Sequence, residues 1–428
     1  MDPFTIRAGS LHCEGVALTE IAERVGTPVY VYSTAAMLSQ VELFRRSLEP
    51  LNNPLIAYAV KANSNAAVVA TLARAGLGAD IVSGGEYRRA RAAGIPPSRI
   101  VFSGVGKTEA EMALALEGGV FQFNIESLEE AETLSAVASS MGATAPAAFR
   151  VNPDVAGGGH AKITTGTAGN KFGIPITDAL DFYDRAARLP NLKLQGVAVH
   201  IGSQLSSLGP FEDAFRKIGA LIGELRGRGH TIENADLGGG LGVPYDPAQP
   251  FPPSPADYGA MVRSVSRGWD VRLVFEPGRL IVGNAGVLLS SVIRVKPGAA
   301  HPFVIVDAAM NDLMRPALYE AWHKIDAVRP RGERWAANVV GPVCETGDTF
   351  ATAREMDRVG AGELVVFRTA GAYAATMSGT YNSRPLTPEV LVDGDRWAVV
   401  RQRIDVEALI AADSIPDWLT GCAADGSD

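Results

Sequence analysis

The feature that most constrains the fold is a repeated alternation of short apolar segments with amphipathic helical patterns. Eight apolar segments have strand length and lie at 56–60, 80–82, 100–102, 121–125, 147–151, 194–200, 233–237 and 272–275. Helical patterns follow at 66–75, 86–93, 109–117, 128–139, 178–188, 211–226 and 257–266. Eight strand–helix units over roughly 250 residues are typical of a (β/α)8 TIM-like barrel. A doubly wound sheet gives the same alternation, but the count of eight favours the barrel.

The pattern changes after Gly278, where strand-like segments follow one another with few helices between them. These segments lie at 287–295, 303–306, 363–367, 390–392 and 397–403. Such a run predicts a mostly β second domain. We therefore expect an α/β chain with a barrel over 30–280 and a β-sandwich-like or barrel-like C-terminal domain over 281–428. We expect residues 1–29 to pack with the C-terminal domain.

Composition narrows the class of partners. The chain is 47% hydrophobic and 20% charged, as in a globular protein, and its net charge of -8 leaves no basic footprint for nucleic acid or anionic membrane. Three widely separated cysteines, Cys13, Cys344 and Cys422, fit a reducing cytoplasm and show no metal-ligand spacing. We expect a cytoplasmic protein without a signal peptide, a membrane span or a metal.

Lys61 follows the first predicted barrel strand, within the stretch YAVKAN at 58–63. A lysine at the carboxyl end of a barrel strand points into the barrel mouth, where barrel active sites lie. Burial there lowers the pKa of the amine and makes it a nucleophile toward carbonyls. A surface lysine at a strand end gives the same pattern, so this residue alone leaves both interpretations open.

A glycine-rich loop, LGGGLG at 237–242, follows the seventh predicted strand. Gly239 and Gly240 would expose backbone N–H groups that suit a phosphate, and barrels often bind phosphate after strands seven and eight. A flexible turn is the alternative. Taken alone, the loop does not decide between the two.

The stretch EPGR at 276–279 follows the eighth predicted strand. Glu276 could hydrogen-bond a pyridine nitrogen and keep it protonated, as the acidic partner of pyridoxal phosphate does. Arg279 could bind a substrate carboxylate. An ordinary Glu–Arg surface pair remains the alternative.

Further candidates lie after the sixth strand and in the second domain. His200 could stack on a flat ring and Ser203 could bond a phosphate, although a strand-end histidine is often structural. Arg315 and Tyr319 share one face if their segment is helical, and could bind a carboxylate or form a surface pair. Cys344 could be catalytic or a small buried hydrophobe. Lys61, the glycine loop and Glu276 together define one cofactor pocket.

Eight ordered motifs resemble those of the diaminopimelate decarboxylase family, within the alanine-racemase-like, fold-type III pyridoxal-phosphate enzymes. They are YAVKAN (58–63), NKFGI (170–174), HIGSQ (200–204), GGGLG (238–242), EPGR (276–279), MNDLMRP (310–316), GPVCETGD (341–348) and GAYAATMSGTYNSRP (371–385). The similarity extends from about residue 28 to residue 397. It implies decarboxylation of meso-2,6-diaminopimelate to L-lysine and carbon dioxide, the last step of lysine biosynthesis.

The resemblance also implies roles for individual residues. Lys61 would carry pyridoxal 5′-phosphate covalently, with His200 on its ring and Glu276 at its pyridine nitrogen. The phosphate would be held by Ser203, Gly239, Gly240 and Tyr373, with Gly278 and Arg279 in the same pocket. The substrate would contact Arg279, Arg315, Tyr319, Glu345 and Tyr373. Cys344 would donate the proton that replaces carbon dioxide, and a homodimer would share its active sites.

Other functions with this cofactor remain possible from the sequence. Ornithine, arginine and carboxynorspermidine decarboxylases are relatives. Ornithine decarboxylases, however, have Cys-Asp where this chain has Cys344-Glu345. They also carry His-Val-Gly-Ser-Gly in place of HIGSQ. A racemase would need a tyrosine base that no matching motif supplies. A cofactor-carrier protein would resemble the barrel alone.

Overall fold

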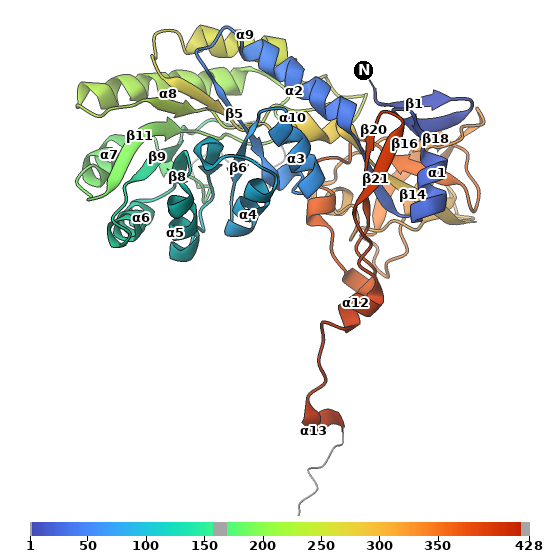
Figure 1. The fold of residues 1–428 in the computed structure, drawn as a ribbon. Helices are drawn as coiled ribbons and strands as arrows, with labels where there is room; N and C mark the ends of the chain where they lie inside the picture. Colours follow the sequence, from blue (N-terminus) through green and yellow to red (C-terminus); the bar gives the residue numbers. More distant parts are fainter. Residues whose placement is uncertain (1, 157–168, 421–428) are drawn as a thin grey trace, which may run out of the picture.

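The computed structural model describes residues 2–156 and 169–420. Eight parallel strands close into a barrel (Figure 1). They are β5 (Leu55–Ala59), β6 (Gly78–Ile81), β7 (Ile100–Phe102), β8 (Gln122–Ile125), β9 (Ala145–Asn152), β11 (Leu192–Ala198), β12 (Asn234–Asp236) and β13 (Arg272–Phe275). The pairing of β13 with β5 and of β8 with β9 completes the ring. The predicted barrel is confirmed and the doubly wound alternative is wrong.

Seven predicted helices surround the barrel. They are α3 (Ala66–Arg74), α4 (Gly84–Ala92), α5 (Glu109–Gly118), α6 (Leu128–Ser140), α7 (Ala179–Ala186), α8 (Gly209–Gly227) and α9 (Pro255–Val265). Short β10 (Ile174–Pro175) adds to β9 outside the ring. Only the single turn α10 (Arg279–Val282) directly follows β13.

Helix α2 (Thr34–Leu48) was not predicted from the sequence. It precedes the first barrel strand and packs against α9 and α10. Ser33 caps its N-terminus by accepting a hydrogen bond from the Ala36 N–H. Its buried face includes Phe44, whose ring lies 6.1 Å from that of Tyr258 and 5.9 Å from that of Phe275. The helix thereby covers the side of the barrel that α10 is too short to cover.

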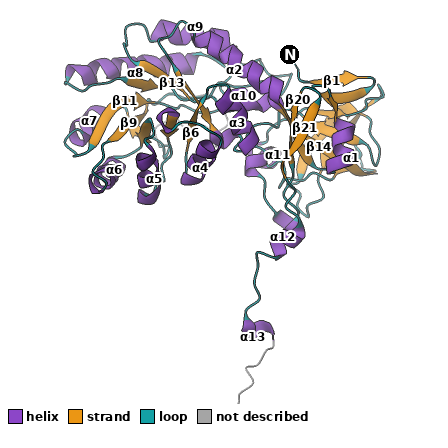
Figure 2. Cartoon of the chain, in the orientation of Figure 1, coloured by secondary structure: helices purple, strands orange, loops and turns teal. Residues whose placement is uncertain are grey.

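The second domain is mostly β, as predicted, and Figure 2 shows its strands gathered beside the barrel. Its strands are β4 (Val29–Ser33), β14 (Gly286–Lys296), β15 (Phe303–Val306), β16 (Ile325–Ala327), β17 (Arg334–Val340), β18 (Thr349–Asp357), β19 (Leu364–Phe367), β20 (Glu389–Asp393) and β21 (Arg396–Arg401). The strands β16, β17 and β18 were not predicted.

The N-terminal segment belongs structurally with the second domain. Strands β1 (Phe4–Arg7), β2 (Ser10–Cys13) and β3 (Val16–Ala17) form a small sheet followed by α1 (Leu18–Val25). Their apolar side chains share one core with β4, β14, β19 and β20. Because β4 pairs with β14 and β20, the boundary expected at residue 30 falls inside a strand of the second domain.

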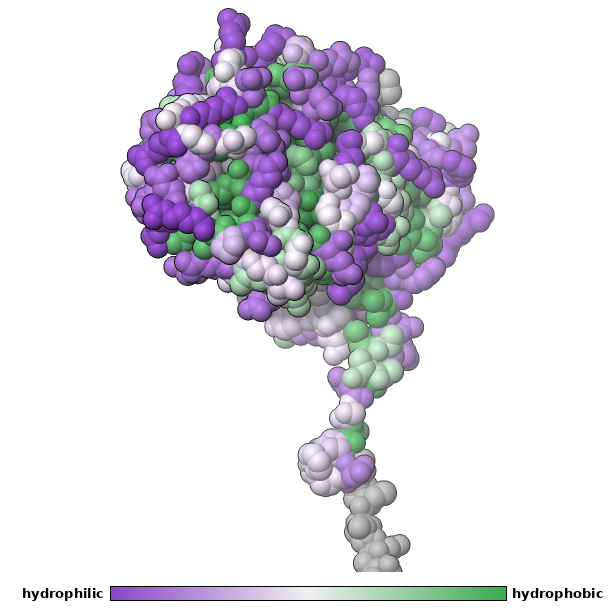
Figure 3. All heavy atoms as spheres, turned by 60° about the vertical axis from the view of Figure 1, so that its left-hand side comes forward, coloured by the Kyte–Doolittle hydropathy of each residue, from purple (hydrophilic) through white to green (hydrophobic). Residues whose placement is uncertain are grey.

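The chain after β21 leaves the body as an arm that carries α12 (Val406–Ile410) and α13 (Asp417–Thr420) (Figure 1). Figure 3 shows apolar surface where this arm leaves the molecule. Cys422 lies outside the described residues. Within the described ranges, no helix has both the length and the apolar character needed to cross a bilayer.

Candidate functional site

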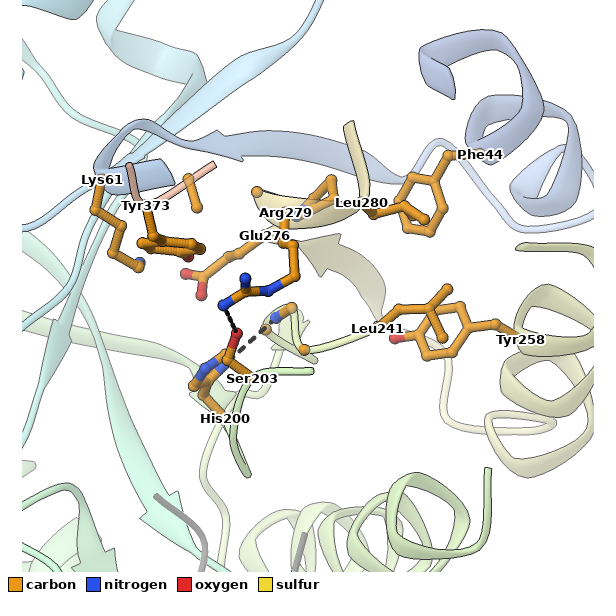
Figure 4. A pocket seen from close by; sticks show the side chains of 16 residues that line it. Phe44, Lys61, His200, Ser203, Leu241, Tyr258, Glu276, Arg279, Leu280 and Tyr373 are labelled. Carbon is orange, nitrogen blue, oxygen red and sulfur yellow. Dashed lines mark hydrogen bonds between the residues drawn. The ribbon is translucent and has the colours of Figure 1, made fainter. Parts of the chain in front are cut away.

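Most predicted site residues meet in one cavity at the carboxyl ends of the barrel strands (Figure 4). The empty space in and in front of this cavity is about 510 Å³, part of it open to solvent. Its lining includes Lys61, His200, Ser203, Gly238, Gly239, Gly240, Glu276, Gly278, Arg279 and Tyr373. A second cavity lies beside the first and shares Lys61, His200 and Glu276 with it. The predicted cofactor residues therefore face a common space.

Lys61 lies in a 3-10 turn (Val60–Ala62) directly after β5, so its amine reaches the cavity from a rigid strand end. The amine forms an ion pair with Asp80, which is fully buried on the adjacent strand β6. Burial lowers the pKa of Lys61, but the carboxyl groups of Asp80 and Glu276 outweigh burial and raise the pKa above its usual value. These contacts favour the protonated form of the Lys61 amine.

The loop after β12 has a backbone that only glycine fits. Gly240 has a φ of +110°, and a Cβ on Gly239 would lie 2.3 Å from the carbonyl oxygen of Glu276. The Gly239 N–H donates to Nδ1 of His200 over 3.2 Å. A loop held this close to the β13 end, with no side chain in the way, can present backbone N–H groups to a phosphate. The residues therefore fit a phosphorylated cofactor.

Glu276 belongs to a buried polar cluster at the base of the cavity. The Ser103 hydroxyl donates to its Oε1 over 3.3 Å, and the Asn124 amide donates to Asp236 over 2.8 Å. Burial raises the pKa of Glu276 well above its usual value, and the charges of Asp236 and Asp80 raise it further. Both effects favour the protonated form of the Glu276 carboxyl group. A cationic pyridine nitrogen nearby would reverse that balance.

His200, at the end of β11, is held in its neutral form. Burial lowers its pKa well below the usual value, and the cationic Arg150 and Lys61 lower it further. Arg150 itself pairs with Glu126 over 3.1 Å. A neutral imidazole whose Nδ1 accepts from Gly239 is fixed in orientation and suited to lie against a flat ring.

The guanidinium group of Arg279 contacts three other side chains around the cavity. Its Nη2 donates to the Ser203 hydroxyl over 3.2 Å, and its Nη1 donates to the Tyr245 hydroxyl over 2.6 Å. Its guanidinium lies 4.7 Å from the centre of the Tyr373 ring (Figure 4). Tyr373 reaches this place because its backbone N–H donates to the carbonyl oxygen of Ala62, beside Lys61.

Arg315 and Tyr319 lie on the short helix α11 (Arg315–Tyr319) and line an adjoining cavity. The predicted helical face is thus present. Tyr245 also lines that cavity, and its ring centre lies 4.4 Å from the Arg315 guanidinium. The hydrogen bond between Arg279 and Tyr245 therefore lies between the two cavities.

Cys344 and Glu345 are not brought into the cavity of their own chain. Both are exposed, so the interpretation of Cys344 as a small buried hydrophobe is wrong. Their loop is tied down by Asp348, which accepts from the Val343 N–H over 2.7 Å. The Cys344 N–H donates to Asn382 over 3.3 Å. These two residues do not line the cavity of Lys61.

The sequence patterns did not predict four further residues at the site. Asp80 and Asp236 lie within buried strands, where an acid among apolar residues is itself a signal of a site. Tyr245 and His323 lie in loops, and no periodic pattern marked them. They join the site only through tertiary contacts.

Comparisons with known proteins first define the class. Residues 35–283 match the family model for the pyridoxal-dependent decarboxylase, pyridoxal binding domain. This range contains the barrel and every residue of the glycine loop and of EPGR. The chain is therefore a pyridoxal-dependent decarboxylase by family, as the geometry of the cavity suggests.

Full-length relatives define the family more closely. The diaminopimelate decarboxylase of Zymomonas mobilis is 52% identical over 421 residues, covering 98% of this chain and 100% of that protein. The Pseudomonas aeruginosa enzyme of the same name is 50% identical, with 97% and 99% covered. A solved diaminopimelate decarboxylase from M. jannaschii, in complex with L-lysine, is 35% identical with a TM-score of 0.94, covering 98% and 99%. The chain belongs to the diaminopimelate decarboxylase family.

Proposed function

We propose that this protein uses pyridoxal 5′-phosphate to decarboxylate meso-2,6-diaminopimelate to L-lysine and carbon dioxide, the last step of lysine biosynthesis. The observation that carries the proposal is the shared cavity. A lysine after β5, a glycine loop after β12 and a buried acid after β13 face one space. Membership in the diaminopimelate decarboxylase family supports the choice of substrate.

The cofactor roles follow from where the groups lie. Lys61 binds the cofactor covalently through its amine, and His200 lies against the ring. Gly239, Gly240, Ser203 and Tyr373 hold the phosphate, and Gly278 and Arg279 complete the wall. Glu276 would face the pyridine nitrogen and keep it protonated. When bound, pyridoxal phosphate supplies the electron sink for the bond that breaks.

The substrate roles depend on charge. Arg279, Arg315 and Tyr319 bind or position a substrate carboxylate, with Tyr373 in the same wall. Glu345 attracts the ammonium group of the distal D-centre. Cys344 donates a proton to the carbon that has lost carbon dioxide. His200, being neutral, keeps its side of the site free of an additional cation.

We further propose a cytoplasmic homodimer in which each Cys344–Glu345 loop completes the partner's site. The exposure of that loop and its absence from the lining of the Lys61 cavity support this arrangement. We place the division between the domains after β4 and near residue 283, close to the predicted limits of 30 and 280, because β4 pairs with β14 and β20.

The test is a substrate panel. Purified holoenzyme is incubated separately with meso-diaminopimelate, ornithine, arginine and carboxynorspermidine, and released carbon dioxide is measured. We expect release from meso-diaminopimelate, with L-lysine formed in equal amount and much slower release from the others. A higher kcat/KM for any of the other three would overturn the assignment of substrate.

A further inference from the structure

Two guanidinium groups lie against the same aromatic ring without an acidic partner. The centre of the Tyr245 ring lies 5.7 Å from the Arg279 guanidinium and 4.4 Å from that of Arg315. Both arginines are buried, and neither forms an ion pair with a carboxylate of residues 2–156 or 169–420. Two buried cations at such separations from one ring repel each other, and an anion placed between them would be strongly attracted.

Tyr245 holds one of the two cations by its hydroxyl. The hydroxyl oxygen accepts a hydrogen bond of 2.6 Å from Nη1 of Arg279. The ring face meanwhile lies against the Arg315 guanidinium, an arrangement that stabilises a cation without cancelling its charge. Tyr245 thereby contacts both arginines, one through its hydroxyl and one through its ring.

His323 holds the other cation. It is 2% exposed, and its Nε2 lies 2.9 Å from Nη1 of Arg315. Its Nδ1 lies 2.8 Å from the backbone carbonyl oxygen of Arg368. A carbonyl oxygen can only accept, so Nδ1 carries the proton and Nε2 accepts from the guanidinium. The ring is also braced edge-on against Tyr245, with 5.4 Å between ring centres.

The neutral state of His323 is a consequence of the same contacts. Burial lowers its pKa to about 3, and the neighbouring charge of Arg315 contributes in the same direction. At neutral pH the residue accepts a hydrogen bond without adding a positive charge or a negative one. A carboxylate at this position would also orient Arg315, but it would neutralise the cation that the substrate needs.

We propose that Tyr245 and His323 are positioning residues that hold Arg279 and Arg315 as an unneutralised pair of cations for a substrate carboxylate. The inference rests on the proposed function, since it takes Arg279 and Arg315 as the carboxylate-binding residues. It adds the requirement that the groups supporting them be neutral hydrogen-bond acceptors.

The test compares three variants of one residue in the holoenzyme. His323→Gln keeps a neutral acceptor, His323→Leu removes the acceptor, and His323→Glu replaces it with a carboxylate. A hydrogen bond to a charged group corresponds to roughly a 10- to 100-fold change in affinity. We expect KM for meso-diaminopimelate to rise about 10-fold or more in the Leu variant and further in the Glu variant. In both, kcat should change less than KM, and the Gln variant should stay within about threefold of the parent.

Two further variants keep the test decisive if His323→Leu does not fold. Tyr245→Phe retains the ring and removes only the hydroxyl that accepts from Arg279, so we expect a rise in KM with little change in kcat. His230→Leu is the control, because that histidine also hydrogen-bonds a neighbour, Asp184 over 2.8 Å, but lies outside the cavities of the site. It should leave KM and kcat unchanged. Equal KM values for His323→Gln and His323→Glu would overturn the inference.

A binding measurement separates this inference from the proposed reaction. Heptanedioate carries the two carboxylates of the substrate skeleton without its amines, and its affinity for the holoenzyme is measured by calorimetry. We expect His323→Glu to bind it at least 10-fold more weakly than His323→Gln does. If that holds while the parent does not decarboxylate meso-diaminopimelate, the proposed function fails and the cation pair stands. If turnover is normal but the two variants bind heptanedioate equally, or the parent does not bind it, the cation pair is wrong.

Discussion

Burial beside Asp236 and Asp80 raises the pKa of the Glu276 carboxyl group, so this group holds its proton more tightly than an exposed carboxyl group does. A neutral acid can donate that proton to a pyridine nitrogen and then pair with the cation it has made. The raised pKa is thus compatible with a carboxylate–pyridinium pair in the loaded enzyme. The surrounding hydrogen bonds from Ser103 and Asn124 keep the group oriented in either state.

Replacing Glu276 tests this role. Glu276→Gln keeps the shape of the side chain and removes the ionisable group. We expect the variant to bind the cofactor and to lose about 10²- to 10³-fold in kcat, the effect typical of removing one strong electrostatic contact in a site. Cofactor absorbance and kcat for meso-diaminopimelate are measured together. Near-normal turnover with the cofactor bound would contradict the role of Glu276.

His323 also makes stability depend on pH. Its pKa is about 3 in the folded protein and near 6.5 when unfolded, so between these values the unfolded chain binds a proton that the folded chain does not. Stability is therefore lost as pH falls from 6.5 toward 3, by up to about 1.4 kcal/mol per pH unit. Between pH 7.5 and pH 5, the free energy of unfolding measured with urea should fall by about 2 kcal/mol more in the parent than in His323→Gln. Equal losses would contradict the assigned state of His323.

At the scale of elements, the glycine loop after β12 leaves no room for a side chain at Gly239. A methyl group on Gly239 would meet the carbonyl oxygen of Glu276 at 2.3 Å, so the loop or the β13 end must move. We expect Gly239→Ala to weaken cofactor binding by about 5- to 150-fold, since overpacking of this kind costs about 1–3 kcal/mol. Fluorescence titration of the apoenzyme measures the affinity.

The control for that change is Gly223→Ala on α8. No atom lies within 4 Å of the place where its Cβ would be, and alanine favours a helix over glycine. Cofactor affinity should stay at the parent value. If both glycine variants bind the cofactor as tightly as the parent, the close approach of the loop to β13 is not needed for binding.

The elements that the sequence predicted are those whose pattern reflects burial. The barrel strands are short apolar runs, and strands such as β7 and β8 are buried on both faces. By contrast, β17 mixes exposed and buried residues irregularly, so no period of two was visible. Helix α2 was not predicted because it precedes the first strand of the barrel. It joins the helices around the barrel only through tertiary contacts with α9 and α10.

The site residues that the sequence predicted are those that follow barrel strands. Lys61, Gly239 and Glu276 follow barrel strands, and the fold itself brings strand ends together. Tyr245 and His323 lie in two loops and are 78 residues apart in the sequence. Only the folded chain shows that both contact Arg315. Their role depends on tertiary contacts that no local pattern encodes.

At the scale of the whole molecule, the cofactor residues and the proposed proton donor lie in different places. Lys61 faces the barrel cavity, whereas Cys344 lies on an exposed loop of the second domain. A two-fold dimer would bring the Cys344–Glu345 loop of each subunit to the cavity of the other subunit. Each dimer would then contain two completed sites. This arrangement has a consequence that can be measured without a structure of the dimer.

Mixing two inactive variants tests the shared site. In a heterodimer of Lys61→Ala and Cys344→Ala, one site receives both lesions and the other receives none. Random subunit exchange makes about half of the dimers mixed, so activity should return to roughly a quarter of the parent level. Mass spectrometry confirms the exchange, and each variant alone is the baseline. No recovery after confirmed exchange would place Cys344 at the site of its own chain or outside catalysis.

The central claim is that Lys61 binds the cofactor covalently in the barrel cavity. Holoenzyme is reduced with borohydride, digested, and its peptides are mapped by mass spectrometry for the mass of the reduced cofactor. We predict the label on Lys61 alone. Lys107 is the internal comparison, since its side chain is fully buried in an ion pair with Glu130 over 2.6 Å and does not line the cavity. A label on Lys107 or any other lysine, with Lys61 unmodified, would contradict the account.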